Sequence, residues 1–226
     1  MNIIALDTST EYCSLALWLN NELISKEVLA GQRHSELLLP MLHTMLVEAS
    51  ITLNQIDGIA FGAGPGSFTG LRIACGVVQG LAFSQNIPVI GISTLEALAQ
   101  QVNAPKVLAA LDARIGELYF AAYEKTAAGS WTSIHAPLLC RPEAAPVIEG
   151  AGWTGCGSGF DLYHADLSQH YSNNLQQIMP DCYPHAREIA QLAVIKFAKG
   201  EGKAAEEALP VYIRNKVALK ESERRR

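Results

Sequence analysis

The segments LDTSTEYCSLAL (residues 6–17) and LDARIGELYFAA (residues 111–122) decide the fold. Each contains an apolar strand, a turn that begins with an aspartate, and a second apolar strand. Because the same local order occurs twice, the chain contains an internal duplication. It predicts two lobes with similar openings, joined near residue 105.

The first lobe is expected over residues 1–104. Asn20-Asn21 lies between two apolar runs and is a hairpin signal. Ser35 is the expected N-cap of the first helix. The expected elements, in chain order, are strands at 3–6, 14–19 and 23–29, a helix over 36–49, a strand at 58–62, a helix over 69–85, a strand at 88–92 and a helix over 94–101.

The second lobe is expected over residues 105–226, with a less regular pattern. It opens with strands at 107–111 and 117–124. Residues 137–146 are predicted to be a linker, because a proline stands at each end. A helix over 185–199 ends before Gly200, and we expect this last helix to pack back on the first lobe.

Composition limits the classes of protein. The 226 residues are 49% hydrophobic and carry a formal net charge of −5, with a basic cluster in the tail KESERRR (220–226). A protein that grips nucleic acid alone usually presents a basic patch, so we expect contact with RNA only through a partner. The sequence has neither a membrane-length apolar run nor a signal peptide, which indicates a cytoplasmic protein.

Cysteine and histidine spacing argues against a metal site. The five cysteines form no C-x-x-C pair. His34 and His43 are nine residues apart, on opposite sides of a helix, and cannot bind one ion. His164, His170 and His185 are scattered and are expected at the surface.

The glycine-rich stretch FGAGPGSFTGLRIACG (61–76) resembles a phosphate loop only superficially. It lacks the Walker A spacing and its lysine, and Thr69 stands where a dinucleotide fingerprint needs glycine. A sharp strand-to-helix turn, capped by Ser67 or Thr69, is the better interpretation. Gly76 and Gly80 share one face of the helix that follows, which favours close approach of a neighbour, in the core or in another chain.

The first helix is apolar around nearly its whole circumference, whereas a surface helix normally has one apolar stripe. One side can cover the sheet of this chain. The other side requires either a partner subunit or a fully internal position.

The turn Asp7-Thr8-Ser9-Thr10 is the main candidate ligand site. Its hydroxyls could bind phosphate oxygens, and Asp7 could hold a hydrated magnesium ion. The alternative is that these residues are ordinary turn formers. Ser67 lies outside a G-x-S-x-G frame, which disfavours a serine hydrolase.

Several segments together resemble the TsaB (YeaZ) family, bacterial subunits of the tRNA threonylcarbamoyladenosine machinery. They are DTST, RHSELLLPML, GIAFGAGPGSFTGLRIACGVVQGLA, VIGISTLEAL and LPVYIRNKVA. The resemblance implies an α/β, two-lobed actin-like (ribonuclease H-like) fold, in which each lobe is a mixed sheet flanked by helices. It also implies a relation to the transferase TsaD and to proteins once described as glycopeptidases.

One departure from the catalytic relatives bears on function. Those relatives carry N-H-L-E-G-H after the fifth strand, and its two histidines bind a metal. Here the segment is STLEAL, with Thr94 and Leu98 at the ligand positions. Because leucine cannot coordinate a cation, we expect no metal and no transferase activity in this chain.

The resemblance also assigns a nucleotide site to Asp7, Thr8, Ser9, Thr10 and Asp112. Arg114 is bulkier than the small residue usual after the second aspartate, and it would crowd a phosphate. We expect a degenerate site that binds ADP or ATP with Mg²⁺ only weakly, and no cofactor required by this chain.

The resemblance therefore implies a non-catalytic scaffold that pairs with a TsaD-type subunit, works with a TsaE-type ATPase, and supports transfer to adenosine 37 of tRNAs reading ANN codons. It should form a homodimer when its partner is absent. The expected interface residues are His34, Leu38, Met41, Leu42, Met45, Leu71, Ile73, Gly76, Val77 and Gly80.

The alternative is an enzyme of the same fold, a metallopeptidase or a nucleotide hydrolase. A metallopeptidase would require bound metal, which Thr94 and Leu98 disfavour. A sugar kinase would require a catalytic base and a larger substrate domain than 226 residues allow.

Overall fold

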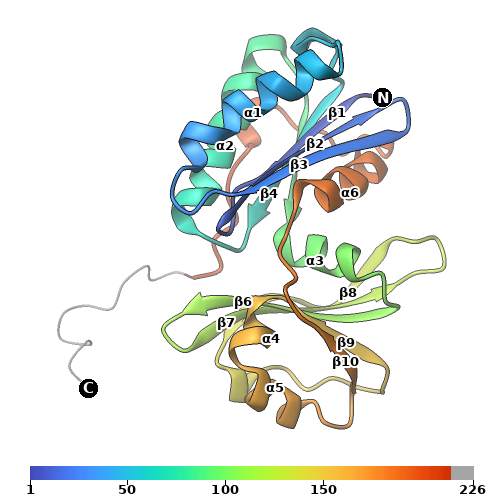
Figure 1. The fold of residues 1–226 in the computed structure, drawn as a ribbon. Helices are drawn as coiled ribbons and strands as arrows, with labels where there is room; N and C mark the ends of the chain where they lie inside the picture. Colours follow the sequence, from blue (N-terminus) through green and yellow to red (C-terminus); the bar gives the residue numbers. More distant parts are fainter. Residues whose placement is uncertain (215–226) are drawn as a thin grey trace.

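The structure is a computed structural model that describes residues 1–214. It contains two lobes, one above the other in Figure 1, each built on a mixed β-sheet. The basic tail KESERRR lies outside the described residues. None of the helices within residues 1–214 combines the length and hydrophobicity that a membrane span requires.

The first sheet has the strand order β3-β2-β1-β4-β5. Its strands are β1 (Ile3–Asp7), β2 (Tyr12–Leu19), β3 (Glu22–Leu29), β4 (Gly58–Gly64) and β5 (Val89–Ser93). β1 and β3 pair with β2 antiparallel, whereas β4 pairs with β1 and β5 in parallel. The predicted hairpin is confirmed, because Asn20 and Asn21 form the turn with positive φ angles of 53° and 66°.

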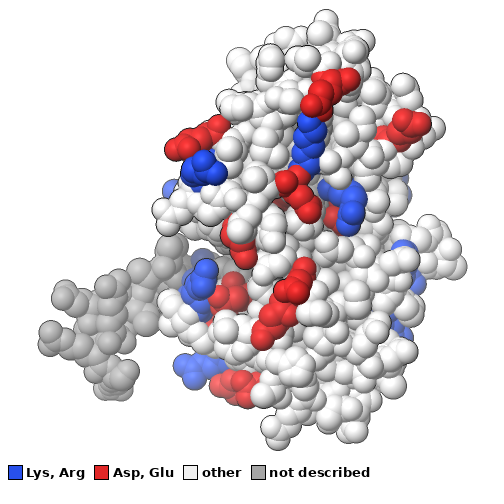
Figure 2. Space-filling model, viewed as in Figure 1, with Lys and Arg blue, Asp and Glu red and all other residues white. Residues whose placement is uncertain are grey.

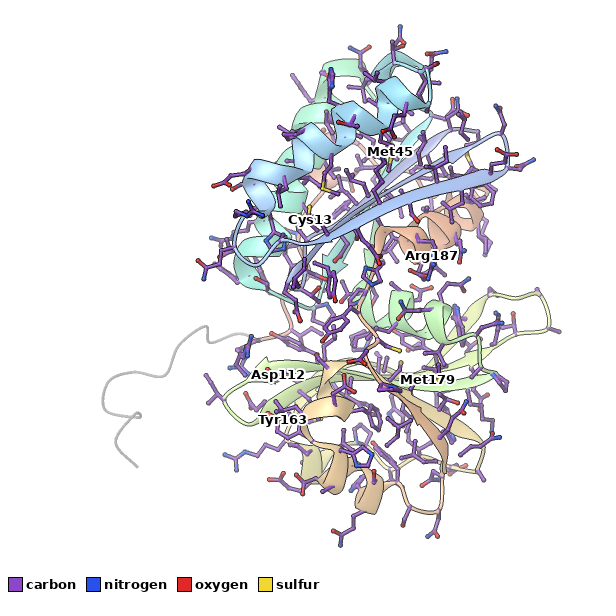
Figure 3. All side chains as sticks on the ribbon, viewed as in Figure 1. Cys13, Met45, Asp112, Tyr163, Met179 and Arg187 are labelled. Atoms are coloured by element: carbon purple, nitrogen blue, oxygen red, sulfur yellow. The ribbon has the colours of Figure 1, made fainter. Side chains whose placement is uncertain are left out.

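Helices cover both faces of this sheet. α1 (His34–Glu48) and α2 (Phe68–Gln85) lie side by side on one face, and α6 (Ala186–Ala198) covers the other (Figure 1). Met45 is 1% exposed and packs between α1 and the sheet (Figure 3). The lobe therefore buries an apolar core on each side of its sheet.

The second sheet repeats this topology, with the order β10-β9-β6-β7-β8. Its strands are β6 (Lys106–Arg114), β7 (Glu117–Lys125), β8 (Trp131–Cys140), β9 (Trp153–Cys156) and β10 (Leu175–Met179). β6 and β7 pair antiparallel, as β1 and β2 do, and β9 joins β6 in parallel, as β4 joins β1. The duplication predicted from the sequence is therefore confirmed in the strand order.

The remaining helices complete the layers. α4 (Ser158–Leu162) and α5 (His164–His170) cover the outer face of the second sheet, and α3 (Thr94–Val102) lies between the lobes (Figure 1). Short 3₁₀ helices occur at Leu53–Gln55, Pro142–Ala144 and Ala205–Glu207. Two lobes, each a mixed sheet flanked by helices, confirm the predicted α/β actin-like fold class.

Polar side chains connect the lobes around α3. The indole Nε1 of Trp131 donates to Gln100 Oε1 at 2.9 Å, and Gln100 Nε2 donates to Gln191 Oε1 at 2.8 Å. The chain itself passes between the lobes at residues 103–105 and again at residues 180–185.

Two local predictions are wrong. α1 begins at His34, not after Ser35, because the buried His34 ring contacts the Tyr12 carbonyl 3.2 Å away and holds the helix start against β2. The predicted linker at 137–146 begins inside β8, an edge strand. Pro137 is tolerated there because the pairing with β7 shifts register beside it and an edge strand leaves one side unpaired.

The expected surface position of His185 is also wrong. His185 is 8% exposed, and its ring packs edge-on against Tyr12, with centroids 5.3 Å apart. Its Nδ1 atom lies 3.3 Å from Glu27 Oε2. His185 therefore joins the start of α6 to the first sheet.

Candidate functional site

The aspartate turn of the first lobe is buried. Asp7, Thr8 and Ser9 are 0%, 0% and 2% exposed, and Thr10 is half-buried. The hydroxyl of Thr8 donates to the Gly70 carbonyl at 2.7 Å. A phosphate could reach these residues only if the segment above them moved.

That segment is the glycine loop with the first turn of α2. The Ser67 amide donates to the Ser9 carbonyl at 2.7 Å, and the Ser67 hydroxyl caps α2 by accepting from Gly70 N at 3.3 Å. A Cβ at Gly70 would overlap the Thr8 carbonyl. The glycines therefore allow the loop to close directly onto the aspartate turn.

Asp7 is the least satisfied group of this turn. Its Oδ1 accepts from the Ser9 amide at 3.0 Å and from the Ser9 hydroxyl at 2.8 Å. Its Oδ2 is buried, and no described residue bonds to it. A Cβ at Gly62 would overlap that oxygen. Burial of the carboxyl raises its pKa from 3.8 to about 7, against the two hydrogen bonds from Ser9.

The aspartate turn of the second lobe is open to solvent. Asp112 Oδ1 accepts from the Arg114 amide at 2.8 Å, and Oδ2 pairs with Arg114 Nη1 at 3.3 Å. The Arg114 side chain is 87% exposed. Burial, and then the carboxylate of Asp112, raise the pKa of Tyr163, whose side chain lies next to Asp112 (Figure 3).

In this arrangement, other parts of the chain contact both turns. The glycine loop covers the Asp7 turn. In the second turn, the Arg114 side chain pairs with the Asp112 carboxylate. A hollow lined by Gly66, Phe68 and Tyr119 lies between the lobes, but its volume is about 50 Å³. Ligand pockets usually measure about 300–1,000 Å³. No hydrogen bond or ion pair within residues 1–214 joins Asp7 to Asp112.

Thr94 and Leu98, the two positions at which the resemblance implied lost metal ligands, are both buried. Thr94 is fully buried, and its hydroxyl donates to the Pro65 carbonyl. Leu98 is fully buried and packs beside Gly157. These residues do not fit a metal ion. In the part of the chain that the structure describes, no three His, Cys, Asp or Glu side chains cluster as metal ligands would.

The predicted interface residues fall into two groups. His34, Leu38, Leu42, Met45 and Leu71 are buried within this chain, so a partner cannot touch them directly. The other five lie where a partner could reach them. Met41, Ile73 and Val77 are half-buried, and Gly76 and Gly80 are exposed.

The outer surface of α1 and α2 nonetheless carries exposed apolar side chains among its polar ones. We define the helical face as Leu39, Val47, Gly76, Gly80 and Phe83. Leu39, Val47 and Phe83 are 49%, 62% and 82% exposed. A Cβ at Gly76 or Gly80 would meet nothing within 4 Å. The fully internal position considered for the first helix is therefore wrong.

Leu39, Val47 and Phe83 are not among the predicted interface residues. Helical spacing could have placed Phe83 on the same face as the two glycines. It lies three residues after Gly80 and seven after Gly76 in α2. Leu39 and Val47 are eight residues apart, which also places them on one stripe.

Charges on the face seen in Figure 2 alternate in sign. Lysine and arginine stand next to aspartate and glutamate rather than forming one basic area. Among the described residues, the ion pairs Lys26–Glu48 and Lys106–Glu124 also bring opposite charges together. This face lacks the electrostatic footprint of a protein that binds nucleic acid alone.

Comparison with known proteins agrees with this architecture. The model of the family "TsaD: tRNA N6-adenosine threonylcarbamoyltransferase" matches residues 23–221. This match covers both lobes and most of the chain, so the chain belongs to the TsaD class of proteins.

Within that class, the chain is similar to TsaB proteins over nearly its whole length. The chain is 37% identical to the "tRNA threonylcarbamoyladenosine biosynthesis protein TsaB" of Escherichia coli, covering 97% of each chain. It is also 37% identical to the TsaB protein of Haemophilus influenzae, covering 97% of this chain and 96% of that protein. The solved structure of YeaZ from Pseudomonas aeruginosa is 40% identical, with a TM-score of 0.87 over 93% of this chain and 99% of that chain. The chain belongs to the TsaB (YeaZ) family.

Proposed function

We propose that this chain is a non-catalytic scaffold subunit for threonylcarbamoyl transfer to adenosine 37 of tRNAs reading ANN codons. It would act in the cytoplasm, pair with a TsaD-type catalytic subunit, work with a TsaE-type ATPase, and meet tRNA only through the assembled complex. The names of its relatives support a role in making this modification. The observation that carries the scaffold role is the exposed apolar helical face.

The geometry of that face favours a helical partner. Gly76 and Gly80 leave open space above α2, and Phe83 projects beside them. Small residues allow close backbone approach, and a large exposed aromatic supplies a central anchor. The same face could pair two copies of this chain when the partner is absent.

The absence of catalysis by this chain is part of the proposal. It is supported by Thr94 and Leu98, whose side chains do not fit a metal. The buried Asp7 turn supports weak binding, at most, of ADP or ATP with Mg²⁺, and no required cofactor. No specific observation favours a peptidase or a nucleotide hydrolase.

A matched pair of substitutions tests the interface. Phe83→Asp places a charge on the helical face, and Val147→Asp places one on the second lobe; both original side chains are 82% exposed. Titration calorimetry with the purified TsaD-type subunit should show binding weakened about thirtyfold or more for Phe83→Asp, the loss typical of an interface anchor, and unchanged for Val147→Asp. If the Phe83→Asp variant bound the TsaD-type subunit with wild-type affinity, the interface would not include the helical face.

A further inference from the structure

The end of the described chain makes a non-covalent connection between the lobes. After α6, the chain stays on the first lobe, where Lys203 pairs with Val89 of β5 and Gln79 Nε2 donates to the Ala208 carbonyl at 3.0 Å. Residues 211–214, here named the strap, then run from the first lobe to the second (Figure 1). The strap is thus a third link, beside the two covalent crossings.

The first half of the strap is fixed to the glycine loop and α2. The Val211 amide donates to the Ala63 carbonyl at 2.7 Å. The Tyr212 hydroxyl accepts from Arg72 Nε at 2.9 Å, and its ring lies 5.2 Å from the Phe68 ring. The Arg72 guanidinium lies 3.8 Å above the Phe68 ring, which adds a cation–π contact.

The last residue of the strap is fixed to the second lobe. Arg214 Nη2 donates to Glu117 Oε2 at 2.6 Å and to the Arg114 carbonyl at 3.3 Å. The two side chains of this ion pair are 15% and 31% exposed. A partly buried, charge-assisted hydrogen bond is stronger than an exposed ion pair.

We propose that the strap is a conformational lock that holds the lobes in the observed arrangement, with the Arg214–Glu117 ion pair as its second-lobe anchor. Val211 and Arg214 are three residues apart, a stretch of chain that spans at most about 10 Å. Their anchors on different lobes therefore cannot separate far unless one anchor breaks. The hollow lined by Gly66 and Tyr119 lies beneath the strap and would widen on release.

Distance measurements between the lobes test this lock. Nitroxide labels at Gln85→Cys and Val147→Cys, both exposed positions, report the separation in a Cys140→Ser background, since the other four cysteines are buried. Pulsed electron paramagnetic resonance should show a longer and broader distance distribution for Glu117→Gln and for Arg214→Gln. The matched control is Glu124→Gln, because Glu124 is on the same strand but pairs with Lys106 within the second lobe.

A charge swap distinguishes loss of the Arg214–Glu117 ion pair from general destabilisation of the fold. Glu117→Arg combined with Arg214→Glu restores an ion pair across the lobes and should return the distribution toward that of the unsubstituted protein. An unchanged distribution in both single variants would overturn the proposal. Equal broadening in Glu124→Gln would also overturn it, because that result would mean that any loss of charge loosens the lobes.

Discussion

The two aspartate turns occupy equivalent places in duplicated sheets, yet their surroundings are opposite. Asp7 is fully buried beneath the glycine loop, and one of its oxygens has no partner among the described residues. Asp112 lies beside a solvent-exposed turn, where an exposed arginine pairs with it. Repetition of a topology therefore does not repeat a site, because the loops that close over each sheet decide what the turn can reach.

The difference arises from the segment after the fourth strand of each lobe. In the first lobe, that segment is the glycine loop, whose small residues let it contact the Asp7 turn. In the second lobe, the short helix α4 follows β9, and Ser158 at its start accepts a hydrogen bond from the Asp112 amide at 3.1 Å. The second turn is thus contacted at its backbone, while its carboxylate is 13% exposed and pairs with the exposed Arg114.

The largest expected effect comes from filling the close contact in the first lobe. Gly70→Ala puts a methyl group into the Thr8 carbonyl and should lower the free energy of unfolding by about 4 kcal/mol or more, because backbone must move. Gly76→Ala, in the same helix, meets nothing and should raise it by about 0.5–1 kcal/mol. Urea denaturation of both variants measures the contrast. Equal effects would show that the loop does not pack tightly on the turn.

The buried carboxyl of Asp7 predicts a pH dependence of stability. Its folded-state pKa of about 7 exceeds its ordinary value of 3.8, so the folded protein binds more protons between these values. The contribution of Asp7 is complete below the lower value and is lost as pH rises toward 7. Between pH 5 and pH 8 this loss should be roughly 3 kcal/mol.

Asp7→Asn checks that dependence, because it keeps the shape of the side chain and removes its titration. Its unfolding free energy, relative to the unsubstituted protein, should increase from pH 5 to pH 8. A difference that stays constant over this range would mean that Asp7 does not titrate there.

The smallest expected effect concerns the turn of the second lobe. Ile115 and Gly116 form it with φ angles of 59° and 73°, and the left-handed region is unfavourable for a β-branched residue. Ile115→Asn creates an Asn-Gly turn and should raise the unfolding free energy by about 1 kcal/mol. Asn20→Ile, in the β2–β3 hairpin of the first lobe, should lower it by a similar amount. Thermal unfolding measures both variants; a less stable Ile115→Asn or a more stable Asn20→Ile would contradict this account of the two hairpins.

The sequence predicted the fold better than the site. Strand–turn–strand repetition and Asn20-Asn21 are local signals, and the duplicated sheets confirm them. The burial of Asp7 depends on how the glycine loop folds back onto it, a contact between residues far apart in the sequence. The residues D-T-S-T suit an exposed phosphate turn and a buried structural turn equally well.

The interface prediction had the same difficulty. Periodicity located the apolar helices but could not tell which side faces the sheet, because α1 is apolar nearly all round. Leu38 and Leu42 proved to be core, whereas Leu39 and Val47 are exposed. Only the packing of α1 against the sheet separates these two sets.

The measurement that tests the central claim most directly is tRNA threonylcarbamoylation with purified components. The reactions contain this chain alone, the TsaD-type and TsaE-type partners without it, and all components together. The proposed scaffold role predicts modified tRNA only in the complete mixture. Modification by this chain alone, or undiminished modification without it, would contradict that role.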